Sequence, residues 1–389
     1  MKLFGNHKEA KHVTGKRFEL TEEYDFYEEE KTTDKSGSEE KPKRKGIRIF
    51  IIVLLVLLAL GACGYGFLNG YIRPPAASGK IRPVTPDDTG IHGEDQNTDG
   101  SAPAGRYDHK YTFLLLGCDD GNGNTDTIMV GTFDAKEYTL DIVSIPRDTL
   151  VNVSWTTKKA NTLYGRDNVE RAKSGFSDLL GYDLDFYMIV DLQAFVQLVD
   201  AVGGIRYNVP DVEGGGKGMN YEDPAQNLYI HLKPGEQVLT GQQAVGVVRY
   251  RKGYRNADIG RIGTQQDFLM TAAKQIIDNK NSISLKDIIT IFLNYVKTDL
   301  DYGECAWFAK ELLKMDVENI NFHTLPGKYD DSLHQGDRYV SYVTIYVDEW
   351  LEMINTYLNP FDQDIKESNL NILTRDRNGN LYATSGKIA

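Results

Sequence analysis

Three arginines lie close together in an otherwise acidic chain. Arg249, Arg251 and Arg261 fall within thirteen residues, whereas the chain of 389 residues carries a formal net charge of −12. A guanidinium group stays charged at any relevant pH and donates paired hydrogen bonds to phosphate oxygens. Each arginine alone would be ascribed to a solvent-exposed ion pair. Their grouping instead predicts an anion site, suited to a phosphate or pyrophosphate group.

A fourth arginine stands beside a carboxylate at the end of a predicted strand. In the segment SIPRDT, Arg147 and Asp148 directly follow Pro146. Proline lacks the N–H that a sheet ladder needs, so the strand should end there and the next side chains should project from it. Ligands of α/β folds usually bind at such strand ends. The alternative interpretation is a surface ion pair.

Carboxylates flank a glycine-rich loop in the segment GCDDGNGNTDT. Asp119 and Asp120 follow one predicted strand and Asp126 begins the next. Such residues can meet on one hard cation, because Mg²⁺ takes one or two carboxylates and completes its shell with water and phosphate oxygens. The alternative is that Asp and Gly here only form a turn. Taken together, the three segments favour an anion site.

Alternating β-rich and helical periodicities predict the elements that hold these residues. Asp191 should cap a helix that Gly203-Gly204 ends, a second helix should begin at Thr240, and a third should cover residues 264–278. The predicted strands are Tyr111–Gly117, Thr127–Asp134, Tyr138–Ser144, Phe186–Val190, Ile205–Val209 and Tyr229–Leu232. This order predicts an α/β fold, a layered α-β-α domain with a central mixed sheet.

An uncharged apolar run, Ile49–Leu68, precedes the predicted domain. About 20 residues at roughly 1.5 Å each match a hydrocarbon core about 30 Å thick, so residues 47–69 are expected to form a transmembrane helix. The cations that crowd its N-terminal flank are Lys41, Lys43, Arg44, Lys45 and Arg48. By the positive-inside tendency the N-terminus is cytoplasmic and the domain extracellular. A cleaved signal peptide or a lipobox at Cys63 fits less well, because the charged region ahead is long and the apolar run is full-length.

Composition divides the rest of the chain. Residues 1–46 are charged and poor in aliphatics and should be a disordered tail, and residues 70–108 are Pro/Gly-rich and should be a linker. The folded domain is expected at 109–360, followed by a polar C-terminal extension at 361–389. Of three cysteines only Cys118 and Cys305 lie beyond the apolar run, too few for a disulfide framework. The acidic balance argues against a nucleic-acid partner.

The order and spacing of these segments resemble the LytR-CpsA-Psr family of bacterial cell-wall assembly enzymes, which carry a single N-terminal membrane helix. The resemblance covers roughly residues 109–330. Its segments are LLLGCDD, TDTIMV, LDIVSIPRD, DLQAFVQLVDAVGGI, HLKPGEQVLTGQQAV and RYRKGYRNADIGRIGTQQ. It implies Mg²⁺-dependent transfer of a phospho-glycopolymer, such as teichoic acid or a capsular-type polysaccharide, from an undecaprenyl-pyrophosphate carrier to peptidoglycan.

The resemblance also implies a role for each matching residue. Asp119 and Asp126 would bind the metal. Arg147, Arg249, Arg251 and Arg261 would bind the pyrophosphate, with Asp148, Asp258 and Gln265 orienting these groups. Asp148 or Asp258 could also take the proton from the acceptor hydroxyl. The chain departs from the family at Asn124 and Thr264, where arginine is usual, and Lys158, Lys159 or Lys252 could supply the missing charge.

Two other functions are compatible with the same residues. A lipid-pyrophosphate hydrolase would need the same charged residues but no peptidoglycan acceptor. A membrane-bound transcription attenuator is suggested by the family's historical name, yet the charged tail contains no basic helix-turn-helix segment.

Overall fold

The structure is a computed structural model, and it describes residues 71–82, 105–118, 125–165, 168–224, 228–254, 257–281, 284–335 and 338–389. The predicted tail at 1–46 and transmembrane helix at 47–69 lie outside these ranges, as do Asp119, Asn124 and the side chain of Asp258. Within the described ranges, no helix combines the length and the apolar character that crossing a bilayer requires.

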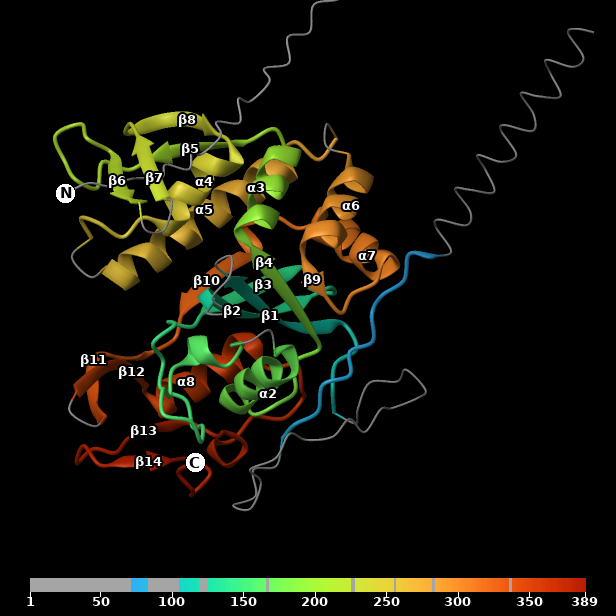
Figure 1. The fold of residues 1–389 in the computed structure, drawn as a ribbon. Coiled ribbons are helices and arrows are strands. Elements are labelled where there is room, and N and C mark those ends of the chain that lie inside the picture. Colours follow the sequence, from blue (N-terminus) through green and yellow to red (C-terminus); the bar gives the residue numbers. More distant parts are fainter. Residues whose placement is uncertain are drawn as a thin grey trace, which may run out of the picture. The chain divides into compact units, whose positions relative to one another are not determined.

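A six-stranded mixed sheet forms the centre of the domain (Figure 1), in the order β10-β3-β2-β1-β4-β9. Its strands are β1 (Lys110–Cys118), β2 (Thr125–Asp134), β3 (Thr139–Ser144), β4 (Phe186–Asp191), β9 (Lys297–Thr298) and β10 (Ile320–Thr324). The pairs β1–β2, β2–β3 and β4–β9 are antiparallel, whereas β1–β4 and β3–β10 are parallel. The predicted central mixed sheet is therefore confirmed.

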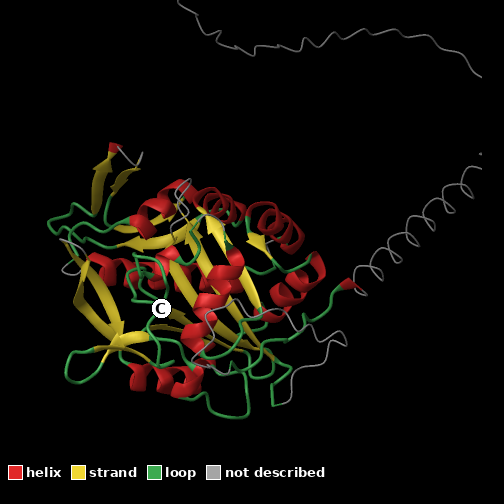
Figure 2. Ribbon diagram, turned by 60° about the horizontal axis from the view of Figure 1, so that its bottom comes forward, coloured by secondary structure: helices red, strands yellow, loops and turns green. Residues whose placement is uncertain are grey.

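Helices cover both faces of this sheet (Figures 1 and 2). They are α2 (Val169–Leu180), α3 (Leu192–Ala201), α4 (Gly241–Arg249), α5 (Ala257–Asp278), α6 (Leu285–Tyr295), α7 (Tyr302–Leu312) and α8 (Val347–Met353). On one face, Leu114 and Leu116 of β1 share a buried cluster with Phe176 of α2 and Trp350 of α8. On the other face, Tyr111 packs in a cluster with residues of α5 and α7. Alternation along β1 sends successive side chains to opposite faces, which explains the two cores.

Smaller antiparallel pairs surround the central sheet (Figure 2). They are β5 (Ile205–Val209) with β8 (Gly235–Leu239), β6 (Met219–Asp223) with β7 (Leu228–Leu232), β11 (Gly327–Gln335) with β12 (Arg338–Ile345), and β13 (Leu373–Arg375) with β14 (Leu381–Ala383). The first two pairs share a core with α4, which places them beside the arginine segments.

The predicted helix signals operate as expected in two places. The Asp191 carboxylate accepts a hydrogen bond from the backbone N–H of Ala194 at 2.6 Å and begins α3. Thr240 begins α4 as part of a capping box with Gln243. Helix α5, in contrast, begins at Ala257 rather than at 264. Two glycines weaken the helical pattern of its first turns, and Gly260 is needed because a Cβ there would lie 2.3 Å from the Tyr254 ring.

Both segments that flank the expected domain also pack on it. Arg82, in the expected linker, is 9% exposed and its guanidinium contacts Asp178 at 2.7 Å and Asp183 at 2.5 Å. In the expected polar extension, Leu370 and Ile372 are fully buried in the main core beside α2 and α8. The packed region therefore reaches beyond 109–360 at both ends.

Candidate active site

One carboxylate joins three arginines that come from three separate segments. Asp126 Oδ1 lies 2.7 Å from Arg147 Nη1, and Asp126 Oδ2 lies 3.2 Å from Arg251 Nη2. Arg261 Nη1 is 3.8 Å from Asp126 Oδ1, and Arg261 Nη2 also donates to the Asp126 backbone carbonyl at 3.3 Å. The structure thus brings Asp126 together with the PRD, RYR and GRIG segments.

Strand ends and one helix face create this meeting point. Asp126 lies at the start of β2, and Arg147 lies just past the end of β3, the antiparallel neighbour of β2. Arg261 lies on α5, and Gln265 follows it one turn later on the same face. Gln265 Nε2 donates to Thr127 Oγ1 at 3.1 Å and to the Val248 carbonyl at 3.0 Å. Gln265 therefore ties α5 to both β2 and α4.

The neighbouring residue on α5, Gln266, contacts the central sheet. Its Nε2 donates to Ser144 Oγ at 3.0 Å and to the His323 carbonyl at 2.9 Å. These partners lie at the ends of β3 and β10, two parallel neighbours in the sheet. Both residues of the glutamine pair therefore act on the position of α5, and through it on Arg261.

The site holds more positive than negative charge. Three guanidinium groups surround one carboxylate, which leaves two positive charges in excess among these four side chains. Arg261 is 3% exposed, and Arg147 and Arg251 are 27% and 37% exposed. The Asp126 carboxylate is a partner common to all three guanidinium groups, and Arg147 also lies 4.0 Å from Asp148. Guanidinium groups gathered in this way suit an anionic ligand such as a phosphate.

A cavity of about 550 Å³ connects the arginines with an apolar wall. Asp126, Arg249, Arg251, Arg261 and Gln265 line one part of it. The apolar wall is built by α3, α5 and α6 and includes Phe195, Leu198, Val199, Phe268, Leu269, Ala272, Ile276 and Phe292. A cavity of this kind suits an amphipathic ligand that has an anionic group and a hydrocarbon chain.

Asp148, a predicted site residue, faces a different partner. Its carboxylate contacts Lys159 Nζ at 2.9 Å and lies 4.0 Å from Arg147 Nε. Asp148 is not among the residues that line the cavity. Its contacts favour a role in holding Arg147 and Lys159 rather than direct contact with a ligand in the cavity.

The predicted metal ligands are only partly visible. Asp126 is described and Asp119 lies outside the described residues. The side chain of Asp258, predicted to orient the charged groups, also lies outside them. Among the described residues, no group of three or more His, Cys, Asp or Glu side chains forms a metal centre. The hard oxygens of Asp126 fit Mg²⁺, which needs only one or two carboxylates when phosphate and water complete its shell.

Of the three lysines considered as replacements for family arginines, Lys252 alone lines the cavity. Lys159 pairs with Asp148, and Lys158 donates to the carbonyl of Ala389 at 2.8 Å. Thr264 is 8% exposed and its hydroxyl lies 2.6 Å from that of Tyr254. Thr264 is therefore a packing residue in this chain.

Tyr221 and Asp223 also line the cavity, and the sequence did not indicate them. Both belong to β6, a short strand that follows a glycine-rich loop and carries little apolar signal. Their closeness to the arginines arises from pairing of β6 with β7, which composition alone does not reveal.

Comparison with known proteins supports the resemblance. A transferase of Bacillus subtilis, named polyisoprenyl-teichoic acid–peptidoglycan teichoic acid transferase TagU, is 25% identical over 298 residues, covering 75% of this chain and 89% of that protein. The TagU of Bacillus mycoides is 29% identical over 221 residues, covering 56% and 68%. Regulatory protein MsrR of Staphylococcus aureus is 26% identical over 201 residues, covering 50% and 58%.

Solved structures show the same fold. Protein gbs0355 from Streptococcus agalactiae gives a TM-score of 0.55 at 24% identity and covers 63% of this chain and 86% of that chain. TagT bound to LI-WTA gives a TM-score of 0.51 at 19% identity and covers 63% and 88%. Residues 84–356 match the model of the LytR_cpsA_psr family. The chain therefore belongs to the LytR-CpsA-Psr family.

Proposed function

We propose that the chain is a phosphotransferase that moves a phospho-glycopolymer from a polyprenyl-pyrophosphate carrier to a hydroxyl of peptidoglycan. The observation that carries the proposal is the cavity, in which Asp126, Arg249, Arg251 and Arg261 meet an apolar wall. Arg147 is not among the lining residues, and it joins the site through its contact with Asp126 at 2.7 Å. The names of the TagU relatives support the substrate class. A pyrophosphate would take the charged end and the polyprenyl chain would lie along α3, α5 and α6.

In the proposed reaction, the acceptor hydroxyl oxygen bonds to the phosphorus that carries the glycopolymer, and its proton passes to a carboxylate, the role that the family resemblance implies for Asp148 or Asp258. The bond from that phosphorus to the bridging oxygen breaks, and polyprenyl phosphate leaves. Negative charge grows on the leaving phosphate, which Arg147, Arg251 and Arg261 would neutralise. Stabilising charge and holding the reactants in line are the main sources of rate in phosphoryl transfer. Arg261 is nearly buried, and Gln265 of the same helix ties that helix to β2. Arg261 is therefore preorganised for this role.

Magnesium is part of the proposal, with Asp126 and Asp119 as its protein ligands. When bound, the ion would neutralise charge on the phosphate oxygens. Asp126 presently contacts arginines, so binding of metal and pyrophosphate would exchange those contacts for contacts of the arginines with phosphate.

We further propose that residues 47–69 anchor the chain in the membrane, with the domain on the outer side. The length of the uncharged run and the cations before it support this arrangement. A lipid-linked donor and peptidoglycan are both reached from that side.

The test is transfer of a labelled glycopolymer from lipid pyrophosphate to peptidoglycan by the full-length protein in detergent. Arg147→Ala should lower the rate by about 100-fold, the usual loss when one preorganised donor is removed. Arg206→Ala is the matched control, because the Arg206 side chain is 65% exposed on β5 and lies 3.5 Å from Glu236. Equal transfer activity of Arg147→Ala and Arg206→Ala would refute the proposed site.

The same assay separates transfer from hydrolysis. Without peptidoglycan a transferase should release little free glycan, and with peptidoglycan the label should appear on the wall polymer. Release of free glycan at one rate in both conditions would identify a pyrophosphatase instead.

A further inference from the structure

Residues 71–82, named the strap here, lie fixed along the domain. Ile81 forms a bridge with Tyr182, and Arg82 N donates to the Gly181 carbonyl at 2.9 Å. The Asp183 N–H donates to the carbonyl of Lys80 at 2.8 Å. These backbone contacts join the strap to the loop between α2 and β4.

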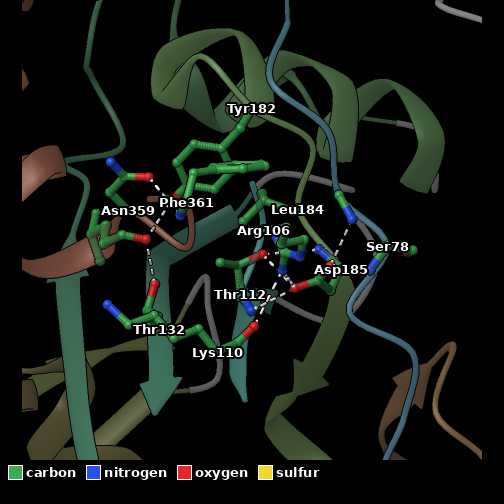
Figure 3. A network of polar contacts seen from close by, with 12 residues as sticks. Ser78, Arg106, Lys110, Thr112, Thr132, Tyr182, Leu184, Asp185, Asn359 and Phe361 are labelled. Carbon is green, nitrogen blue, oxygen red and sulfur yellow. Dashed lines mark hydrogen bonds and ion pairs between the residues drawn. The ribbon is translucent and has the colours of Figure 1, made fainter. Parts of the chain in front are cut away.

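A buried carboxylate holds the middle of the strap (Figure 3). Asp185 Oδ1 accepts from the N–H groups of Ser78 at 3.0 Å and Gly79 at 2.9 Å. Asp185 Oδ2 accepts from Arg106 and from Thr112, and the side chains of Arg106 and Asp185 are both 0% exposed. A Cβ at Gly79 would lie 2.0 Å from the carbonyl oxygen of Asp183, so the contact requires glycine. The two segments that flank residues 83–104 are therefore bound to one carboxylate.

The N-terminal end of the strap lies against the turn between α6 and α7. Ile72 packs on the apolar cluster that contains Ile289 and Cys305, and Arg73 contacts Asp301 at 2.5 Å. A Cβ at Gly303 would lie 2.3 Å from the carbonyl oxygen of Tyr71, which shows how closely the two segments approach. Phe292 of α6 belongs to this cluster and also lines the cavity.

We propose that the end of the domain formed by α6, α7 and the start of the strap is a surface that faces a lipid bilayer, and that the strap holds it there. The inference rests on the membrane anchoring proposed above. Only Asn69 and Gly70 separate the apolar run from Tyr71, and the three Cα steps from Leu68 to Tyr71 span at most about 11 Å. Tyr71 is 47% and Tyr295 38% exposed at this end, and tyrosine is enriched where proteins meet the membrane interface.

The strap changes the geometry expected from composition. A flexible linker of about 39 residues would allow a root-mean-square reach of roughly 35 Å and any orientation of the domain. Because the strap is bound to the domain, residues 83–104 follow the first point at which the chain is attached to it. They therefore do not add to the length of chain between the membrane anchor and the domain. The α6 side of the cavity, where Phe292 lies, is then the side close to the lipid.

Two insertions distinguish these geometries in the full-length protein reconstituted in vesicles. One places a flexible Gly/Ser stretch of about ten residues between Gly70 and Tyr71, and the other places the same stretch between Gly100 and Ser101. Tyr295→Cys carries a fluorophore that brominated lipid chains quench. Tyr339→Cys, 77% exposed on β12, is the distant control, and the parent chain labelled alike gives the background.

Quenching at position 295 should be several-fold stronger than at position 339. The insertion before Tyr71 should abolish that difference, and the insertion after Gly100 should preserve it. Equal quenching at the two positions, or equal effects of the two insertions, would overturn the inference. If labelling of Tyr295→Cys in detergent becomes slower as the protein concentration rises, the surface is covered by a second copy of the chain and does not face a bilayer. A chain that does not sediment with vesicles would refute the anchoring itself, whatever its transferase activity.

Discussion

Replacing Asp126 by asparagine should tighten binding of pyrophosphate when no metal is present. In the structure the Asp126 carboxylate contacts Arg147, Arg251 and Arg261, so an incoming anion must displace it. Asparagine keeps the shape and removes the charge. Two unit charges 4 Å apart attract by about 4 kcal/mol at an effective dielectric constant near 20. Because Asp126 is 31% exposed and its arginine contacts are partly solvated, solvent reduces the net attraction to about 1 kcal/mol.

A gain of about 1–1.4 kcal/mol corresponds to roughly five- to tenfold tighter binding. Titration calorimetry with inorganic pyrophosphate in EDTA measures it, with the exposed, distant Glu236→Gln as the matched control. With Mg²⁺ added, the wild type should gain affinity and Asp126→Asn should gain little. Weaker binding by Asp126→Asn in EDTA would refute the reasoning, because it would mean that the carboxylate positions the arginines rather than competing with the ligand.

Three further predictions concern the cavity and its supports. Ala272→Trp should narrow the apolar wall and raise KM for a polyprenyl donor several-fold, while calorimetry should show unchanged binding of inorganic pyrophosphate. Cys118 lines the cavity, so a lipid donor should slow its modification by a thiol reagent at pH 8; Cys305 should stay unmodified, because burial raises the pKa of its thiol to about 12. The Tyr250 hydroxyl donates to Glu213 at 2.8 Å and lowers the pKa of this carboxyl below its usual 4.5. The ionised carboxylate therefore stabilises the fold above pH 4.5, and this contribution is lost as the pH falls through the lowered pKa. The difference in thermal midpoint between wild type and Glu213→Gln should therefore shrink below pH 4.5, and a constant difference from pH 3 to 7 would contradict this.

Much of the fold could be predicted because local signals agree with tertiary structure. The leucine- and aromatic-rich run of β1 and the β-branched run of β2 are long, and the caps at Asp191 and Thr240 stand directly before helical periodicity. The start of α5 was missed because glycine lowers helix propensity, and only contact with Tyr254 explains why Gly260 is there.

The docked strap was missed for a different reason. Arg82 lies in a Pro/Gly-rich segment, and its partners Asp178 and Asp183 follow 96 and 101 residues later. The sequence of such a segment shows no helical or strand periodicity, so no element is predicted there. Composition cannot show that side chains elsewhere in the chain satisfy the backbone groups of this segment.

The residue types of the site could be predicted, but their pairing could not. The arginines and Asp126 follow from charge and strand-end position in the sequence. That three guanidinium groups share one carboxylate depends on the register of β2 against β3 and on the angle of α5, which Gln265 and Gln266 fix. Asp148 shows the limit of such reasoning, because its neighbour in sequence is a site arginine and its carboxylate contacts Lys159 at 2.9 Å.

A crystal of the domain grown with a polyprenyl pyrophosphate and Mg²⁺ tests the central claim most directly. We expect density for the pyrophosphate within hydrogen-bond distance of Arg147, Arg251 and Arg261, and density for the hydrocarbon chain along Phe195 and Phe268 in the cavity. A head group bound elsewhere, or a cavity that stays empty at saturating ligand, would contradict the proposed donor site.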